Sequence, residues 1–363
     1  MIHLNFCVRL VDRSPGDILL QVPVEDTITT INSITSQNEY ISLSQEQQLA
    51  MTLLHLRDQE NHPYVSTQLP KDHYAIWNLP ESIWDELKLP RCYRESFLAT
   101  RQVVQKFASS SVDGRLLKDR MWAFSMVRSR CTAVPELEAS SSSSSAANIK
   151  HESSTVPIAL LPALDLFNHQ FDAGTLLQLN GTAWTLTSSK SYSSGDQIYL
   201  SYGDEKDNWK LLMTYGFALA DNPNALIFWT WQDLLEAAGK VRPSVFPARV
   251  QQSLLKHPQL HETYTVLSEQ RATFSYDGKA KEPRESLVNG LQLLENLAVQ
   301  LGQPNDASLG KDILEQLLEN RANELKASIE AVQLTEGEAK KEWHSFLSSL
   351  ILVLEEELKC ILH

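Results

Sequence analysis

The stretch of sequence that decides the fold has two parts. The first reads LPALDLFNH at residues 161–169, and the second reads GDQIYLSYGDEKDNWKLLMTYGF at residues 195–217. The first part is an apolar run that ends in polar side chains, and such groups need hydrogen-bond partners when they are buried. In the second part, Gly195 and Asp196 indicate a turn into a strand. A short helix follows, with Gly216 at its predicted C-terminal cap. These patterns predict several polar and aromatic side chains close to one chain reversal.

Each residue of these motifs has an ordinary structural interpretation when it is taken alone. Asn-His after an apolar run is typical of a turn, and a strand tyrosine such as Tyr202 is typical of a half-buried core residue. Arg128 and Arg130 end a predicted apolar helix, where the helix dipole favours cations without any ligand. Single residues therefore do not separate a functional site from ordinary packing.

The order and spacing of the motifs are more informative than any one of them. Arg-Ser-Arg at 128–130 is followed by Asp-x-x-Asn-His at 165–169, Tyr-Gly at 202–203, Asn208 and Tyr-Gly-Phe at 215–217. This series resembles the SET-domain protein methyltransferases, and most of all the Rubisco large-subunit lysine methyltransferase family, which modifies non-histone proteins. The resemblance covers nearly the whole chain by layout and about 60 residues by motif.

The resemblance implies an S-adenosyl-L-methionine-dependent protein N-methyltransferase that transfers methyl to a lysine side chain of a non-histone protein. The implied site residues are Tyr202 as the catalytic tyrosine, Asn168, His169, Arg130 and Phe217 at the cofactor, and Tyr215, Asp165 and Arg130 at the substrate lysine. Asn208 is expected to brace the turn after Tyr202. Methyl transfer from a sulfonium to an amine needs no metal and no protein nucleophile, so no metal ligand is expected.

Two alternatives stay open on the sequence. In the family, the first strand pair carries Gly-x-Gly against the cofactor, whereas the equivalent stretch here is Leu4-Asn5-Phe6. A start placed too late, a wrong first exon and a damaged cofactor pocket all agree with this departure, and the last would leave a SET-like protein-binding module. The other alternative is a histidine-directed methyltransferase of the same family. The identity of the substrate protein and the degree of methylation also stay open.

The predicted fold class is α+β, with a β-rich SET core followed by an all-α C-terminal domain. Residues 1–230 are assigned to the SET domain, with a helical insertion at about 43–130 and a flexible loop at about 139–155 that contains six consecutive serines. Residues 231–363 show amphipathic helical patterns. By resemblance they take the place of the substrate-binding domain of the Rubisco large-subunit lysine methyltransferases (Rubisco LSMT).

Local patterns support this layout. Residues 18–23 read as a buried strand that is stopped by proline. Ser44 and Gln47 have the spacing of a capping box and predict the start of a helix. Thr335 and Glu338 repeat this spacing, which predicts the start of the last helix near the C-terminal end.

The composition indicates which classes of partner the chain can bind and whether its cysteines form disulfides. The net charge of −13 argues against a nucleic-acid surface, because phosphate binding needs clustered Lys and Arg. An acidic chain favours basic, lysine-bearing protein partners by electrostatic steering. The chain has four cysteines, which are Cys7, Cys92, Cys131 and Cys360. They are far apart in the sequence and suggest neither disulfides nor a zinc site.

No apolar run is long enough to span a membrane, and the first residues do not form a signal peptide. These features predict no membrane association and a place in the cytoplasm or the nucleus. We also expect a monomer. Organelle targeting stays open, together with an incomplete N-terminus.

Overall fold

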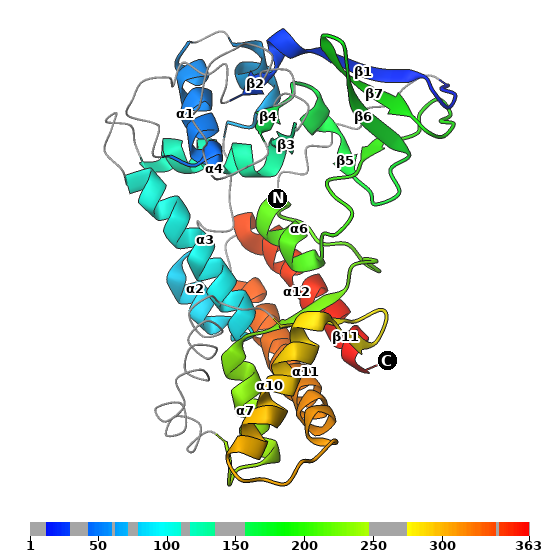
Figure 1. The fold of residues 1–363 in the computed structure, drawn as a ribbon. Helices are drawn as coiled ribbons and strands as arrows, with labels where there is room; N and C mark the ends of the chain where they lie inside the picture. Colours follow the sequence, from blue (N-terminus) through cyan, green and yellow to red (C-terminus); the bar gives the residue numbers. More distant parts are fainter. Residues whose placement is uncertain are drawn as a thin grey trace, which may run out of the picture. The chain divides into compact units, whose positions relative to one another are not determined.

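The computed structural model describes residues 12–29, 43–59, 62–71, 79–109, 117–134, 157–246, 274–338 and 341–362. Two stretches discussed above lie outside these residues, namely Leu4-Asn5-Phe6 and the Ser-rich segment 139–155. Helices and strands are both abundant in the described residues, so the predicted α+β class is confirmed (Figure 1).

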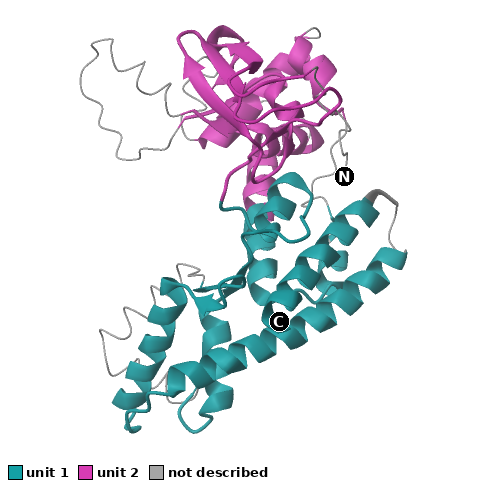
Figure 2. Ribbon diagram, turned by 90° about the vertical axis from the view of Figure 1, so that its right-hand side faces the viewer, with its two compact units in different colours: residues 1, 76–100, 205–363 teal, residues 2–75, 101–204 magenta. Residues whose placement is uncertain are grey.

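The chain divides into two compact units, and each is described by itself (Figure 2). The strand-rich unit comprises residues 2–75 and 101–204, and the helical unit comprises residues 1, 76–100 and 205–363. These units group the chain differently from the domains predicted on the sequence, since residues 76–100 and 205–230 fall with the C-terminal helices. The domain boundary near residue 230 stays a prediction.

In the part of the chain that the structure describes, the strand-rich unit contains three small sheets. The first is antiparallel, in the order β1 (Ile18–Pro23), β7 (Ala183–Ser188) and β6 (Thr175–Asn180). The second, also antiparallel, has the order β2 (Ile28–Thr29), β4 (Ile158–Leu160) and β3 (Thr132–Ala133). The third is the parallel pair β5 (Asn168–His169) and β8 (Tyr199–Leu200). The unit also contains the helices α1 (Gln45–Asp58) and α4 (Leu117–Arg130), which pack against each other.

The strand β1 occupies the residues predicted for it, but the prediction that it is buried was wrong. Ile18 is 51% exposed, and Val22 is the buried residue of this strand. The reason is topological, because among the described residues β1 lies at the edge of its sheet and pairs with β7 alone. The buried side of this sheet is centred on the next strand, where Trp184 and Leu186 belong to the hydrophobic core.

The predicted start of α1 is confirmed. The Ser44 hydroxyl accepts a hydrogen bond from the Gln47 amide, and the Gln47 side chain accepts one from the Ser44 amide. This reciprocal capping satisfies two amide donors that a helix N-terminus otherwise leaves without partners.

The described residues of the helical unit form most of the long helices and one antiparallel sheet. Its elements are α2 (Glu81–Glu86), α3 (Arg91–Ser109), α6 (Asn208–Tyr215), β9 (Leu226–Trp229), α7 (Trp231–Val241), β10 (Phe274–Asp277), β11 (Glu282–Pro283), α10 (Glu285–Gln300), α11 (Leu309–Glu338) and α12 (Lys341–Leu362). The last part of α3, residues 101–109, is grouped with the strand-rich unit. The C-terminal region is mainly helical, but β10 and β11 are strands that the predicted all-α domain did not include. No helix in the described ranges is both long enough and apolar enough to cross a membrane.

Thr335 does not start the last helix, so this prediction was wrong. The helix α11 continues through Glu338, and the Thr335 hydroxyl donates to the carbonyl oxygen of Ala331 one turn earlier. A threonine satisfied in this way stays inside a helix, so capping-box spacing alone does not place a helix start.

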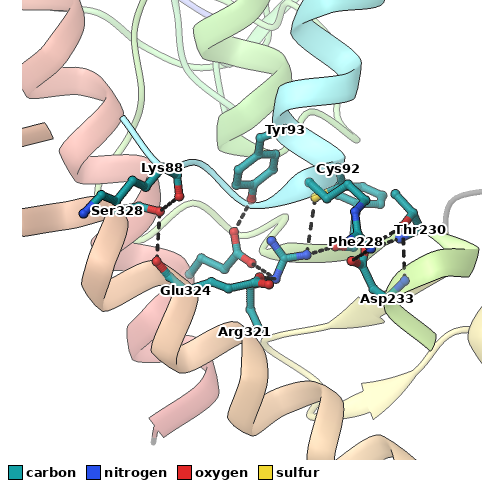
Figure 3. Close-up of polar contacts among 11 residues, drawn as sticks. Lys88, Cys92, Tyr93, Phe228, Thr230, Asp233, Arg321, Glu324 and Ser328 are labelled. Atoms are coloured by element: carbon teal, nitrogen blue, oxygen red, sulfur yellow. Dashed lines mark hydrogen bonds and ion pairs between the residues drawn. The ribbon is translucent and has the colours of Figure 1, made fainter. Parts of the chain in front are cut away.

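One buried arginine joins several elements of the helical unit (Figure 3). Arg321 is 1% exposed, and its Nη2 donates to the carbonyl oxygen of Phe228 and to Cys92 Sγ, the latter at 3.3 Å. Its Nε lies 3.7 Å from Glu357 Oε1, and the Tyr93 hydroxyl donates to the other carboxylate oxygen of Glu357. We call Tyr93, Glu357 and Arg321 the helical-unit triad.

Candidate functional site

The predicted site residues Asn168 and His169 form β5, and Asp165 lies in the turn between β4 and β5, residues 161–167, which we call the site turn. Within it, Ala163 has a φ of 67°, in the left-handed region that costs an alanine roughly 1–2 kcal/mol. The Ala163 amide donates to Gln68 Oε1 over 2.9 Å. A side chain from a distant segment therefore supports this unusual turn.

The parallel pair β5 and β8 brings two predicted motifs together. Asn168 is opposite Tyr199, and His169 is opposite Leu200. Because Tyr202 follows β8 by two residues, the Asn-His pair lies beside the predicted catalytic tyrosine. The two motifs thus form one site in the strand-rich unit.

His169 and Tyr202 are in direct contact. The Tyr202 amide donates to His169 Nδ1 over 3.1 Å, and the two rings stack with centroids 5.1 Å apart and planes at 26°. A ring nitrogen that accepts a hydrogen bond carries no proton, so this contact selects neutral His169 with its proton on Nε2. The ring is 7% exposed, and this backbone contact fixes its orientation.

The hydroxyl of Tyr202 is oriented by a backbone acceptor. It donates to the carbonyl oxygen of Phe167 over 2.7 Å. Burial raises the pKa of Tyr202 to about 12, with smaller effects from Arg130, which lowers it, and Asp165, which raises it. Tyr202 is therefore protonated near neutral pH. Its proton is directed at Phe167, which leaves the oxygen lone pairs to accept from another group.

Arg130 and Asp165 form a buried ion pair. Arg130 Nε lies 3.2 Å from Asp165 Oδ2, and the two side chains are 11% and 3% exposed. The Tyr64 hydroxyl donates to the same carboxylate oxygen over 3.1 Å. Burial raises the pKa of Asp165, while Arg130 and the Tyr64 hydrogen bond lower it. We call Tyr64, Asp165 and Arg130 the site triad.

The other two predicted site residues, Tyr215 and Phe217, belong to the helical unit. Tyr215 is the last residue of α6, and Gly216 caps this helix with a φ of 81°, as predicted. The rings of Tyr215 and Phe217 have centroids 6.2 Å apart, and Lys206 Nζ lies 5.7 Å from the centroid of Tyr215. These two aromatic residues are neighbours across the helix cap, and their role at a lysine channel stays a prediction.

The prediction that Asn208 braces the turn after Tyr202 was wrong. Its side chain donates to the carbonyl oxygen of Leu219 over 2.8 Å and accepts from the Leu219 amide over 3.0 Å. It also accepts from Asn222 Nδ2 over 3.0 Å. Asn208 therefore holds the segment that follows α6. Asn208 is the first residue of α6, and the segment after this helix runs back past its N-terminus, so the side chain reaches Leu219. Spacing along the sequence does not reveal this contact.

Two residues of this site were missed on the sequence, Tyr64 and Gln68. Both lie in a short π-helical segment, Tyr64–Gln68, which follows a proline and has no hydrophobic periodicity to mark it. Their partners are about a hundred positions away, so no local pattern could have indicated these contacts. Among the described residues, no group of three or more His, Cys, Asp or Glu side chains could hold a metal ion.

Comparison with known proteins agrees with the resemblance seen in the motifs. No family model matches the chain. Ribosomal lysine N-methyltransferase set11 of Schizosaccharomyces pombe is 41% identical over 71 residues, which are 19% of this chain and 18% of that protein. SET domain-containing protein 4 of Artemia parthenogenetica is 23% identical over 248 residues, 62% of this chain and 58% of that protein.

A third relative is the chloroplastic ribulose-1,5 bisphosphate carboxylase/oxygenase large subunit N-methyltransferase of Pisum sativum. It is 23% identical over 242 residues, which are 58% of this chain and 45% of that protein. The chain thus spans between 18% and 58% of the length of these curated relatives.

Solved structures extend the likeness to nearly the whole chain. The SET domain of LSMT bound to lysine and AdoHcy matches with a TM-score of 0.60 at 17% identity, covering 97% of this chain and 81% of that one. Rubisco LSMT bound to AdoMet matches with the same TM-score and coverage at 19% identity. At this identity the likeness concerns the fold. The chain therefore has the SET-domain fold of Rubisco LSMT, and the family resemblance predicted from its sequence is confirmed.

Proposed function

We propose that this chain is an S-adenosylmethionine-dependent protein N-methyltransferase that acts on a lysine side chain of a non-histone protein. The observation that carries the proposal is the contact between His169 and Tyr202, which joins the predicted cofactor motif to the predicted catalytic hydroxyl. The lysine methyltransferases among the relatives support the same activity.

The side chains of the site fit the chemistry of this cofactor. Asn168 offers an amide donor and acceptor, His169 a neutral imidazole, and Arg130 a guanidinium, and these groups suit the amino, carboxylate and adenine groups of S-adenosylmethionine. We assign Asn168 and His169 to hold the cofactor, with Arg130 and Phe217 as further contacts. S-adenosylmethionine, when bound, supplies an electrophilic methyl group.

The chain itself has to deliver a neutral amine in line with that methyl group. A lysine ammonium has a pKa of about 10.4, and desolvation in a narrow channel lowers it. The lone pairs of the Tyr202 oxygen face away from Phe167 and can accept from the amine, which orients it. We assign Asp165 and Tyr215 to the substrate lysine. Aromatic walls such as Tyr215 tolerate residual positive charge, worth about 0.5–2 kcal/mol for each good contact.

The substrate and setting of the enzyme follow from the same proposal. We propose a lysine-bearing, non-histone protein as the substrate, with no nucleic acid or membrane partner. The enzyme acts as a monomer in the cytoplasm or the nucleus. The net charge of −13 suits a basic substrate segment.

The proposal is tested by incubating the full chain with labelled S-adenosylmethionine and a cell extract, and then locating the methylated residue by mass spectrometry. We expect methyl-lysine in a non-histone protein, and calorimetry should detect cofactor binding. Methyl-histidine would replace the lysine assignment with a histidine-directed activity. A chain that binds no S-adenosylmethionine would overturn the proposal as a whole.

The first variant to examine is Tyr202→Phe. Because only a hydroxyl is lost, the fold and cofactor binding should persist, whereas methyl transfer should fall roughly a hundredfold or more, as when one oriented group is removed from an active site. Thermal unfolding and calorimetry serve as controls. Unchanged turnover in this variant would remove Tyr202 from its catalytic role.

A further inference from the structure

The π-helical segment Tyr64–Gln68 contacts the site turn at two points. At its first residue, the Tyr64 hydroxyl donates to Asp165 Oδ2 over 3.1 Å. At its last residue, Gln68 Oε1 accepts from the amide of Ala163 over 2.9 Å. One helical turn therefore supports both the left-handed residue of the site turn and the carboxylate that follows it.

The hydrogen bond of Tyr64 differs from that of an ordinary buried tyrosine. Tyr192, in the same unit, is 6% exposed, and its hydroxyl donates to the backbone carbonyl of Ala173 over 2.8 Å. Tyr64 is 2% exposed, yet its hydroxyl donates to a side-chain carboxylate that already pairs with Arg130. A hydrogen bond to a charged group is stronger than one to a neutral carbonyl, so it orients its acceptor more firmly.

Among the described residues, the charged and titratable groups around Asp165 are Arg130, Tyr64 and Tyr202. Cys131 also makes a small contribution that raises the pKa of Tyr64. Burial raises the pKa of Tyr64 well above its usual value, so this hydroxyl stays a donor throughout the range in which an enzyme works. The hydrogen bond from Tyr64 lowers the pKa of Asp165 and opposes the effect of burial. Tyr64 thereby acts on both the orientation and the charge of Asp165.

We propose that Tyr64 is a positioning residue of the methyl-transfer site, which fixes the Asp165 carboxylate through its hydroxyl while Gln68 holds the same turn at Ala163. The inference rests on the proposed function. It assigns to the segment Tyr64–Gln68 a role in the reaction rather than in packing alone.

The test compares Tyr64→Phe with Tyr192→Phe, which remove the same hydroxyl from two buried tyrosines of one unit. In Tyr64→Phe, kcat should fall about 10- to 100-fold, the equivalent of one hydrogen bond to a charged group, while KM for S-adenosylmethionine changes much less. In Tyr192→Phe, kcat should stay within about twofold of the wild type. Thermal unfolding of both variants shows whether they lose comparable stability.

The pH profile provides a readout that a loss of packing would not move. Without the Tyr64 donor the pKa of Asp165 rises, so more of the carboxylate is protonated at a given acidic pH. The acid limb of the kcat/KM profile should therefore shift to higher pH in Tyr64→Phe and stay in place in Tyr192→Phe.

The outcomes separate this inference from the proposed function. An active wild-type chain in which the two variants have the same kcat and the same pH profile would overturn the positioning role of Tyr64 alone. A wild-type chain that methylates no protein would overturn the proposed function, and the inference with it. A selective loss of kcat and a shifted acid limb in Tyr64→Phe would support both.

Discussion

The two units each contain a buried tyrosine, a carboxylate and an arginine, yet the surroundings of the two sets differ. In the helical-unit triad, Arg321 Cζ lies 5.7 Å from the ring of Tyr93 and 5.6 Å from the ring of Trp229, and its guanidinium also reaches the backbone of Phe228. Its partners come from α3, β9 and α12, together with Glu324 of its own helix α11, whose Oε2 lies 3.7 Å from Arg321 Nε (Figure 3). Such an arginine holds the unit together.

In the site triad, Arg130 contacts fewer groups among the described residues than Arg321 does. It pairs with Asp165, and its Nη1 donates to the neighbouring Ser129 hydroxyl over 2.7 Å. Asp165 Oδ1 and Glu357 Oε1 are both buried without a hydrogen-bond partner among the described residues, so this feature does not separate the two triads. Tyr202, the proposed catalytic residue, lies within electrostatic range of both. The same three residue types thus serve stability in one unit and, as we propose, chemistry in the other, and only their neighbours distinguish the two cases.

The largest effect should come from Arg321→Met. This change leaves Glu357 buried without its cation, and breaking a buried ion pair from one side costs about 3–5 kcal/mol. Urea unfolding measures the loss. The double variant Arg321→Met with Glu357→Gln should recover part of it, because no uncompensated carboxylate remains. A single variant as stable as the wild type would refute the structural role of the helical-unit triad.

Asp165→Asn should have an intermediate effect, and it should lower the activity more than the stability. The volume is nearly unchanged and Arg130 keeps some access to solvent, so unfolding should change less than in Arg321→Met. The rate of methyl transfer should fall about a hundredfold, or about 2.7 kcal/mol in the barrier. Steady-state kinetics together with urea unfolding would check this. If Asp165→Asn lost stability and kept its activity, the two triads would be alike after all.

The smallest effect should come from Tyr93→Phe. It removes one hydrogen bond to the Glu357 carboxylate and should cost about 1.5 kcal/mol of unfolding free energy. The rate of methyl transfer should not change below the unfolding temperature. The counterpart in the other unit, Tyr64→Phe, also loses a hydrogen bond to a buried carboxylate and should cost a similar unfolding free energy, but it should in addition lower kcat. Measuring both properties in both variants therefore gives the sharpest comparison.

Local signals in the sequence were sufficient for much of the secondary structure. The Ser44 cap, the strand at residues 18–23 and the helix ending at Gly216 depend on a few neighbouring residues, and all three were predicted. The burial of β1 was predicted wrongly, because the exposure of a strand depends on which strand lies on each side of it. Thr335 was misplaced because its hydroxyl can bond within a helix as well as cap one.

The site was predictable only where the order of motifs carried information. The motif series placed Asn168, His169 and Tyr202 in one site, and the pairing of β5 with β8 accounts for that proximity. The contacts of Tyr64 and Gln68 arise from distant segments and from a short π-helix, for which periodicity gives no signal. Long-range contacts of this kind follow from tertiary packing, which single-residue patterns do not encode.

The discontinuous path of the chain through the helical unit has a consequence for biosynthesis. Tyr93 and Glu357 are 264 positions apart, and Cys92 and Arg321 are 229 apart. As the polypeptide leaves the ribosome, residues 76–100 have to wait for nearly the entire remaining chain before this core can close. A protein cut short before α12 would keep Arg321 but lack Glu357, its buried carboxylate partner, so late truncations should expose the inner surface of the unit to aggregation and proteolysis.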